Sequence, residues 1–294
     1  MKKFFLSLFF SFFLTYAFSA EPVKVRIDDF SGGQNSYDLA SVIQPNQGTL
    51  YKNVILNRKG QLFKRKGQSL WASDVSNTSF KGLGVFNPDI NTSYMVIASD
   101  VEVLRETSPS GEWTRANPSN DLTAGKDTEF IQANDLFFVL NGYDNTANYS
   151  GSAWDPGSSS TASPPTASTG AWLRNYLFLS GNPAHNDWVY FSNNLQPTLF
   201  TSTDLFKINT GDGQPVKKLE PFKNNELIIY KTKSIWILDI TGATPLTDWT
   251  LQPISTVIGT QSPRTVVNFG NDHWLLSSEP FAVRNLVRTT YDKL

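Results

Sequence analysis

The chain has no cysteine among its 294 residues. That absence excludes disulfide bonds, thiolate nucleophiles and cysteine-ligated zinc or iron–sulfur sites. Histidine is scarce too, since His185 and His273 are the only two. They fall in different repeat units, and His273 lies in an apolar segment beside Trp274, which indicates a hydrogen-bonded core residue. The sequence therefore predicts no catalytic residue, no cofactor and no metal site, and a protein that is not an enzyme.

A marked excess of one charge is also missing. The formal net charge is −1, from 25 basic and 26 acidic residues. Removing an N-terminal leader that contains Lys2 and Lys3 leaves 23 basic residues and a net charge of −3. No bulk attraction to nucleic acid or to an anionic membrane follows. No sequence-specific nucleic-acid partner is expected.

The first 20 residues have the parts of a secretory signal. Lys2 and Lys3 precede an apolar run over residues 4–18, and small residues occur at Ala17, Ser19 and Ala20. Cleavage after Ser19 fits this pattern best. The alternative is an uncleaved membrane anchor, but the run is shorter than the ~20 apolar residues that span a bilayer. The pattern predicts export to the periplasm or the medium, and no stable membrane span.

No segment shows the 3.6-residue periodicity of an amphipathic helix. Beyond residue 90, short apolar segments follow a turn-favouring or small polar residue. They begin at Thr92, Asn134, Asn175, Asn225 and Asn271, at intervals of 42, 41, 50 and 46 residues. Periods of ~40–50 residues with about four short strands are typical of propeller blades. We therefore expect an all-β fold, with a β-propeller of four-stranded blades, complete or truncated, over residues 68–294.

Within the repeats, two hairpins are expected, which pair residues 226–230 with 234–239 and residues 95–98 with 101–104. Tryptophans recur near the ends of the units, at Trp71, Trp113, Trp154, Trp188 and Trp249. Because tryptophan buries a large area and recurs with the blade, packing between blades is favoured. A ring of sugar-stacking platforms is the alternative.

Two further patterns are read as loops. Residues 155–170, DPGSSSTASPPTASTG, hold too little apolar surface to form a core, which predicts a long crossing between blades. A flexible partner-binding arm is the alternative. Gly211-Asp212-Gly213 and Asp144-Asn145 have residue types of calcium loops but lack the full spacing. Both are therefore interpreted as turns.

Residues 21–67 are expected to form an arm followed by a first hairpin. A Gly32-Gly33 turn opens an Asn/Gln/Ser-rich segment that is expected to be extended, and two short strands follow around Arg58-Lys59-Gly60. The basic run Lys64-Arg65-Lys66 ends the segment. It is interpreted as a solvated hairpin edge, with contact to DNA phosphates in a lumen as the alternative.

This segment resembles the opening of two related groups of phage proteins, the tail nozzle (tail tubular) proteins and the head-completion or DNA-stabilisation proteins. The arm residues that carry the resemblance are Phe30, Gly32, Gly33, Gln34, Asn35, Pro45 and Asn46. The resemblance implies a structural virion protein near the portal, which assembles as a homo-oligomeric ring on a portal or adaptor with other tail proteins. The leader favours a different class, an exported bacterial propeller that binds glycans or envelope proteins or hydrolyses a glycan.

Overall fold

The structure is a computed structural model that describes residues 29–39, 41–52, 54–56, 61–67, 79–107, 112–118, 121–269 and 272–287. The chain divides into two compact units, Met1–Leu70 and Trp71–Leu294.

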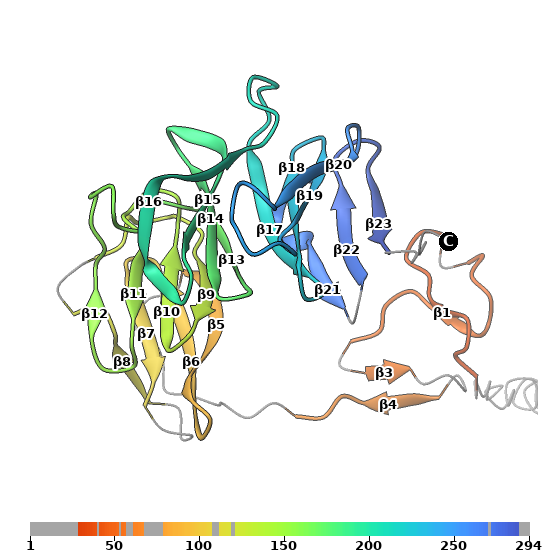
Figure 1. The fold of residues 1–294 in the computed structure, drawn as a ribbon. Coiled ribbons are helices and arrows are strands. Elements are labelled where there is room, and N and C mark those ends of the chain that lie inside the picture. The colour runs from red at the N-terminus through yellow and green to blue at the C-terminus, as the bar shows by residue number, and fades with distance from the viewer. Residues whose placement is uncertain are drawn as a thin grey trace, which may run out of the picture. The chain divides into compact units, whose positions relative to one another are not determined.

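The second unit consists of consecutive antiparallel sheets (Figure 1). The first two sheets contain β5 (Phe80–Asp89), β6 (Thr92–Ser99), β7 (Glu102–Glu106) and β8 (Trp113–Arg115), then β9 (Glu129–Ala133), β10 (Leu136–Leu140), β11 (Ala147–Tyr149) and β12 (Trp154–Asp155). The third and fourth contain β13 (Thr169–Leu173), β14 (Tyr176–Asn182), β15 (His185–Asn193) and β16 (Gln196–Lys207), then β17 (Val216–Phe222), β18 (Glu226–Lys231), β19 (Ile235–Asp239) and β20 (Thr250–Ser255). A short helix, η1 (Pro263–Thr265), precedes β21 (Val267–Phe269), β22 (Asp272–Ser277) and β23 (Ala282–Leu286).

In each sheet the strands follow one another in sequence order. Four sheets have four strands, and the fifth has three within the described residues. The first strands of neighbouring sheets lie together, as β5 does with β9 and β13 with β17. This arrangement is a β-propeller, so the predicted fold is confirmed.

The predicted repeat coincides with the second strand of each sheet. The segments that begin at Thr92, Asn134, Asn175 and Asn225 lead into β6, β10, β14 and β18. Asn134 and Asn175 adopt positive φ, at 53° and 67°. Asparagine tolerates this left-handed conformation, which tight hairpin turns require, better than most residues do. At these two positions the recurring Asn thus has a backbone role.

Both predicted hairpins are present. In one, β18 pairs with β19 from Glu226–Asp239 to Tyr230–Ile235. In the other, Ala98 pairs with Val103 between β6 and β7. All six residues of β18 are buried, which explains why this strand reads as an apolar run and not as an alternating pattern.

Four apolar cores fill the spaces between consecutive sheets, from the first sheet to the fifth. The first and fifth sheets also carry apolar side chains that no core covers. Leu83 on β5 is 69% exposed, and Phe269 on β21 is 76% exposed. Polar contacts link these ends. Arg264 donates to the carbonyl oxygen of Lys81 and pairs with Asp127 at 3.2 Å. Among the described residues, therefore, polar contacts and not an apolar core join the first and last sheets.

The described residues of the N-terminal unit form four short strands. β1 (Gly33–Gln34) pairs in parallel with β2 (Gln47–Gly48), and β3 (Val54–Leu56) pairs antiparallel with β4 (Leu62–Lys64). The segment expected to be extended instead returns on itself, because the amide of Asn35 donates to the carbonyl of Gly48 at 2.9 Å. The predicted hairpin corresponds to β3 and β4, although residues 57–60 lie outside the described residues.

Within the part of the chain that the structure describes, no helix has the length and apolar character needed to cross a bilayer. The predicted signal segment lies outside that part.

Candidate functional site

A pocket of about 440 Å³ lies between the Ser/Thr/Pro-rich loop and the outer strands of the third sheet. The loop connects β12 to β13 and contributes residues 158–161 and 163–166 to the wall. Strands β15 and β16 contribute the rest, apart from Asn145 and Asn182. The volume falls in the range of small-molecule sites, ~300–1,000 Å³.

Three hydrogen bonds attach the loop to neighbouring strands and turns. The amide of Phe200 on β16 donates to the carbonyl of Ala162 at 3.0 Å, and the hydroxyl of Thr146 donates to the carbonyl of Pro165 at 2.6 Å. The amide of Gly142 donates to the carbonyl of Ala167 at 2.8 Å. These bonds attach the crossing to the second and third sheets and shape the pocket.

The other side of the pocket is aromatic. Trp188 and Tyr190 lie two residues apart on β15, so their side chains share one face of the sheet. The exposed imidazole of His185 stacks on the Trp188 ring at 3.8 Å with an interplanar angle of 5°. The ammonium group of Lys207 lies 4.7 Å from the centroid of the same ring. Burial, followed by the charge of Asp187, raises the pKa of Tyr190, so its phenol remains a hydrogen-bond donor.

The tryptophans do not all play one role. Trp249 is 5% exposed, stacks near Phe206 and lies in the core between the third and fourth sheets, as the packing interpretation predicts. Trp188, by contrast, lines the pocket. Sequence reasoning also gave His185 no role, whereas it lies on the pocket wall. The Trp188-x-Tyr190 spacing was a usable signal, but nothing in the sequence placed it beside residues 158–166.

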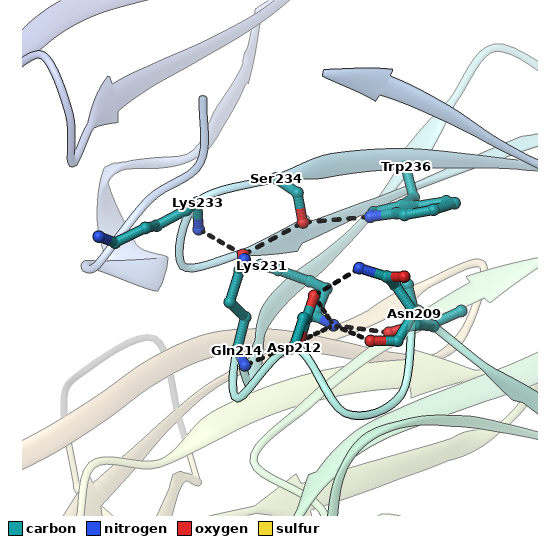
Figure 2. Close-up of polar contacts among 8 residues, drawn as sticks. Asn209, Asp212, Gln214, Lys231, Lys233, Ser234 and Trp236 are labelled. Carbon is teal, nitrogen blue, oxygen red and sulfur yellow. Dashed lines mark hydrogen bonds and ion pairs between the residues drawn. The ribbon is translucent and has the colours of Figure 1, made fainter. Parts of the chain in front are cut away.

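A second polar cluster surrounds a buried lysine (Figure 2). Lys231 is 0% exposed, and its Nζ donates to the carbonyl of Ile208 at 2.6 Å and to both carboxylate oxygens of Asp212 at 2.9 Å. Asp212 also accepts from Asn209 Nδ2 at 2.9 Å and from the amide of Gln214 at 2.8 Å. Burial pushes the pKa of Asp212 upward, but the hydrogen bonds from Lys231, Gln214 and Asn209 outweigh it and leave the pKa below its ordinary value.

This cluster attaches the connection between the third and fourth sheets to the β18–β19 hairpin. Gln214 Oε1 accepts from the amide of Lys233 at 3.0 Å, and Trp236 donates to Ser234 at 3.1 Å (Figure 2). The carboxylate of Asp212, in the Gly211-Asp212-Gly213 motif, therefore forms an ion pair with Lys231. Asp144 is likewise bound, by the amide of Thr123 at 2.7 Å and the side chain of Asn141 at 2.6 Å. Both motifs act as turns, and the described residues hold no cluster of three or more potential metal ligands.

His273 is a buried core residue, as predicted. Its Nε2 lies 3.0 Å from the carbonyl oxygen of Pro221, and its Nδ1 lies 2.8 Å from the hydroxyl of Tyr230. Because a carbonyl only accepts, Nε2 carries the proton, and the Tyr230 hydroxyl donates to Nδ1. Burial lowers the pKa of His273. The histidine thus joins the fourth and fifth sheets in its neutral form.

A third cluster links the first strands of the second, third and fourth sheets. Lys218 lies 3.0 Å from Glu129 Oε2 and 3.8 Å from Glu220 Oε2. Glu129 Oε1 accepts from the hydroxyl of Thr169 at 3.0 Å and from the amide of Gly170 at 3.1 Å. Burial raises the pKa of Glu220, although Lys218 opposes the shift. These groups bond to one another and stabilise the sheets.

The predicted arm residues come together in the N-terminal unit. Pro45 lies in a turn closed by the bond from the amide of Gln47 to the carbonyl of Gln44, at 2.9 Å. Asn46 donates to Ser31 at 3.4 Å. Phe30 packs edge-on against Tyr51, with centroids 6.1 Å apart. Three of the predicted arm residues, Phe30, Pro45 and Asn46, therefore lie in contacts or turns within the N-terminal unit.

The two glycines of the arm are needed for different reasons. Gly33 has φ of 71°, with open space where a Cβ would lie. A Cβ on Gly32 would lie 2.6 Å from the side chain of Gln47. The basic run Lys64, Arg65 and Lys66 is exposed at the end of β4. This exposure is compatible both with a solvated hairpin edge and with contact to DNA phosphates.

No family model and no curated protein matches the chain. Solved structures similar to it include the computationally designed Ika8 protein (12% identity, TM-score 0.43, 71% of this chain and 59% of that one). Another is PorZ, a surface component of the type-IX secretion system of Porphyromonas gingivalis (12%, TM-score 0.47, 80% and 35%). A third is the extracellular domain of a hybrid two-component system from B. thetaiotaomicron (12%, TM-score 0.47, 71% and 27%). The chain thus spans three fifths of the first of these proteins and about a third or less of the other two.

Proposed function

We propose that this protein is an exported, non-catalytic β-propeller that acts by binding, and that the pocket beside Trp188 is its ligand site. The observation that carries the proposal is a contrast within the propeller. Lys231 and His273 are completely buried and bond to neighbouring protein groups. The pocket instead combines aromatic rings with solvent-accessible, uncharged hydrogen-bonding groups. Such a combination is typical of sites that recognise small ligands. The secretory pattern of residues 1–20 supports export.

A thermal-shift screen tests this proposal. The purified chain is heated with a library of oligosaccharides, nucleotides, amino acids and short peptides. A ligand of the folded state present at 100 times its Kd stabilises that state by about 2.7 kcal/mol, which raises Tm measurably. We expect the shift to disappear in Trp188→Ala and to persist in Tyr143→Ala, which removes an aromatic ring that is 61% exposed and does not line the pocket.

Two outcomes would contradict the proposal. One is a ligand that keeps its full shift in Trp188→Ala. The other is conversion of the ligand to product during prolonged incubation, as seen by mass spectrometry, because this would identify an enzyme.

Virion assembly remains a second candidate, and the N-terminal unit favours it. Its internal bonds leave apolar side chains outside, since Tyr37, Leu39 and Val42 are 99%, 76% and 65% exposed. Exposed apolar side chains beside short strands are suited to a neighbour's groove or sheet edge. In this function the unit would link subunits of a ring on a portal or adaptor.

Deletion of residues 28–48 is expected to leave the propeller soluble and β-rich but to abolish incorporation into phage particles. Gly33→Val should weaken incorporation less, because a β-branched residue disfavours the positive φ at this position. Gly32→Val should do so through its contact with Gln47. Ser36→Val, at an exposed position, is the control. Sedimentation of particles with immunodetection of the subunit is the measurement, and normal incorporation of the deletion variant would end this candidate function.

A further inference from the structure

We infer that the ligand of the pocket beside Trp188 is a short segment of a neutral carbohydrate chain, an inference that rests on the binding function proposed above. The first argument is charge. Neither acidic residues nor lysine or arginine line this pocket, and Lys207, whose ammonium group lies 4.7 Å from the centroid of the Trp188 ring, is not part of its wall. A phosphate or carboxylate ligand would need a cationic partner in the wall, and an ammonium ligand would need a carboxylate. The wall therefore suits an uncharged ligand.

The second argument is the kind of polar group that is present. Eight serine and threonine residues line the pocket, together with Asn145 and Asn182. A hydroxyl donates one hydrogen bond and accepts others, and an amide side chain also does both. Sugar hydroxyls have the same dual character, so such a wall can pair with them in many orientations. Ser158 and Ser160 already accept local backbone bonds, at 3.1 and 3.4 Å, but each retains a proton to donate.

The third argument is the aromatic side of the pocket. His185, Trp188 and Tyr190 combine flat apolar surfaces with polar tips, which suits a ligand that is apolar on one side and wet on the other. A pyranose ring has this character, because its C–H groups form an apolar face and its hydroxyls point outward. His185 covers one face of the Trp188 ring, so the aromatic surface that this pair and Tyr190 leave open can contact the apolar face of the sugar while residues 158–161 bond to the hydroxyls.

The size and position of the pocket set the length of the segment. A volume of about 440 Å³ matches a small molecule and not a polymer. The loop rim includes the exposed residues Ser159 and Thr161, and the strand rim includes the exposed residues Thr201 and Ser202. A few sugar units of a longer chain can therefore occupy the pocket while the remainder stays in solvent.

Isothermal titration calorimetry with the full chain tests the inference. The probes are neutral hexasaccharides of glucose, galactose, mannose and N-acetylglucosamine, with hexagalacturonate and glucosamine hexamer as charged counterparts. We expect at least one neutral hexamer to bind and the charged ones to bind at least tenfold more weakly. Trp188→Ala should weaken binding about tenfold or more, whereas Tyr143→Ala should not change it. His185→Ala, at an exposed position, provides a pocket variant whose folding is not at risk, and it should weaken binding about threefold or more.

The inference is overturned if every hexamer fails to bind, if only charged hexamers bind, or if both pocket variants bind as the wild type does. The thermal-shift screen separates this failure from failure of the proposed function. A ligand of another chemical class that is lost in Trp188→Ala would leave the pocket as a binding site and remove the carbohydrate. No ligand sensitive to Trp188→Ala would remove both.

Discussion

Asp212→Ala is expected to lower the free energy of unfolding by about 3–5 kcal/mol, the usual cost of leaving a buried charge without its partner. The Lys231 ammonium is completely buried and would keep only the carbonyl oxygens of Ile208 and Asn209. The substitution would also free Asn209 Nδ2 and the amide of Gln214. Urea denaturation monitored by tryptophan fluorescence measures the loss.

Replacing the lysine in place of the aspartate should lower the free energy of unfolding by less. Lys231→Met places an apolar chain of similar length in the buried site and leaves Asp212 with its bonds from Asn209 and Gln214. Asp212→Asn combined with Lys231→Met should be less destabilising than the sum of the two single changes, because the residues are in direct contact. A loss below about 1 kcal/mol in Asp212→Ala would contradict a fold-stabilising role for this pair.

His273→Ala is expected to lower stability by roughly 3 kcal/mol at pH 7.5, since it opens a cavity and leaves the Tyr230 hydroxyl and the Pro221 carbonyl without their partner. Tyr230→Phe keeps the ring and removes only the donor to Nδ1, so a smaller loss is expected. Ligand binding by the folded protein should remain unchanged in both variants. Thermal and urea denaturation measure the losses.

The same histidine gives stability a pH dependence of known sign. Its pKa in the folded protein lies below the ordinary 6.5 because burial disfavours the charged form. Between those two values the unfolded chain binds more protons, so stability falls as pH decreases below about 6.5. His273→Gln should remove this component, and the difference between the two denaturation curves isolates it from other groups. Parallel stability curves for wild type and His273→Gln from pH 7.5 to 5 would rule the effect out.

The Lys231–Asp212 pair stabilises the fold, whereas His185 lies in the proposed binding pocket, and the sequence pattern predicted neither arrangement. Lys231 was predicted only as part of a hairpin turn, and Asp212 only as part of a glycine turn. Together they attach the loop after β16 to the end of β18. His185 carried no predicted role, yet it lies on the wall of the pocket. In each case the sequence pattern did not show which distant residue each side chain contacts.

The arm shows the opposite situation. Its short motifs lie in one small unit, where Gly33 pairs with Gln47 and the side chain of Asn35 bonds to the same residue. The pattern predicted an extended segment, because Asn, Gln and Ser give no apolar periodicity. Their side chains instead supply the bonds that return the chain on itself.

The sequence by itself determined the repeating all-β architecture, the Asn-led hairpins and the core position of His273. These depend on local chemistry, namely left-handed turn residues beside short apolar segments, and a local pattern is visible within a few residues. Only the tertiary structure decided that residues 158–166 face Trp188 and that Lys231 meets Asp212, 19 residues away. Such contacts depend on how sheets pack and how crossings pass over them. That geometry is set by the summed burial of many residues and leaves no signal at any one position.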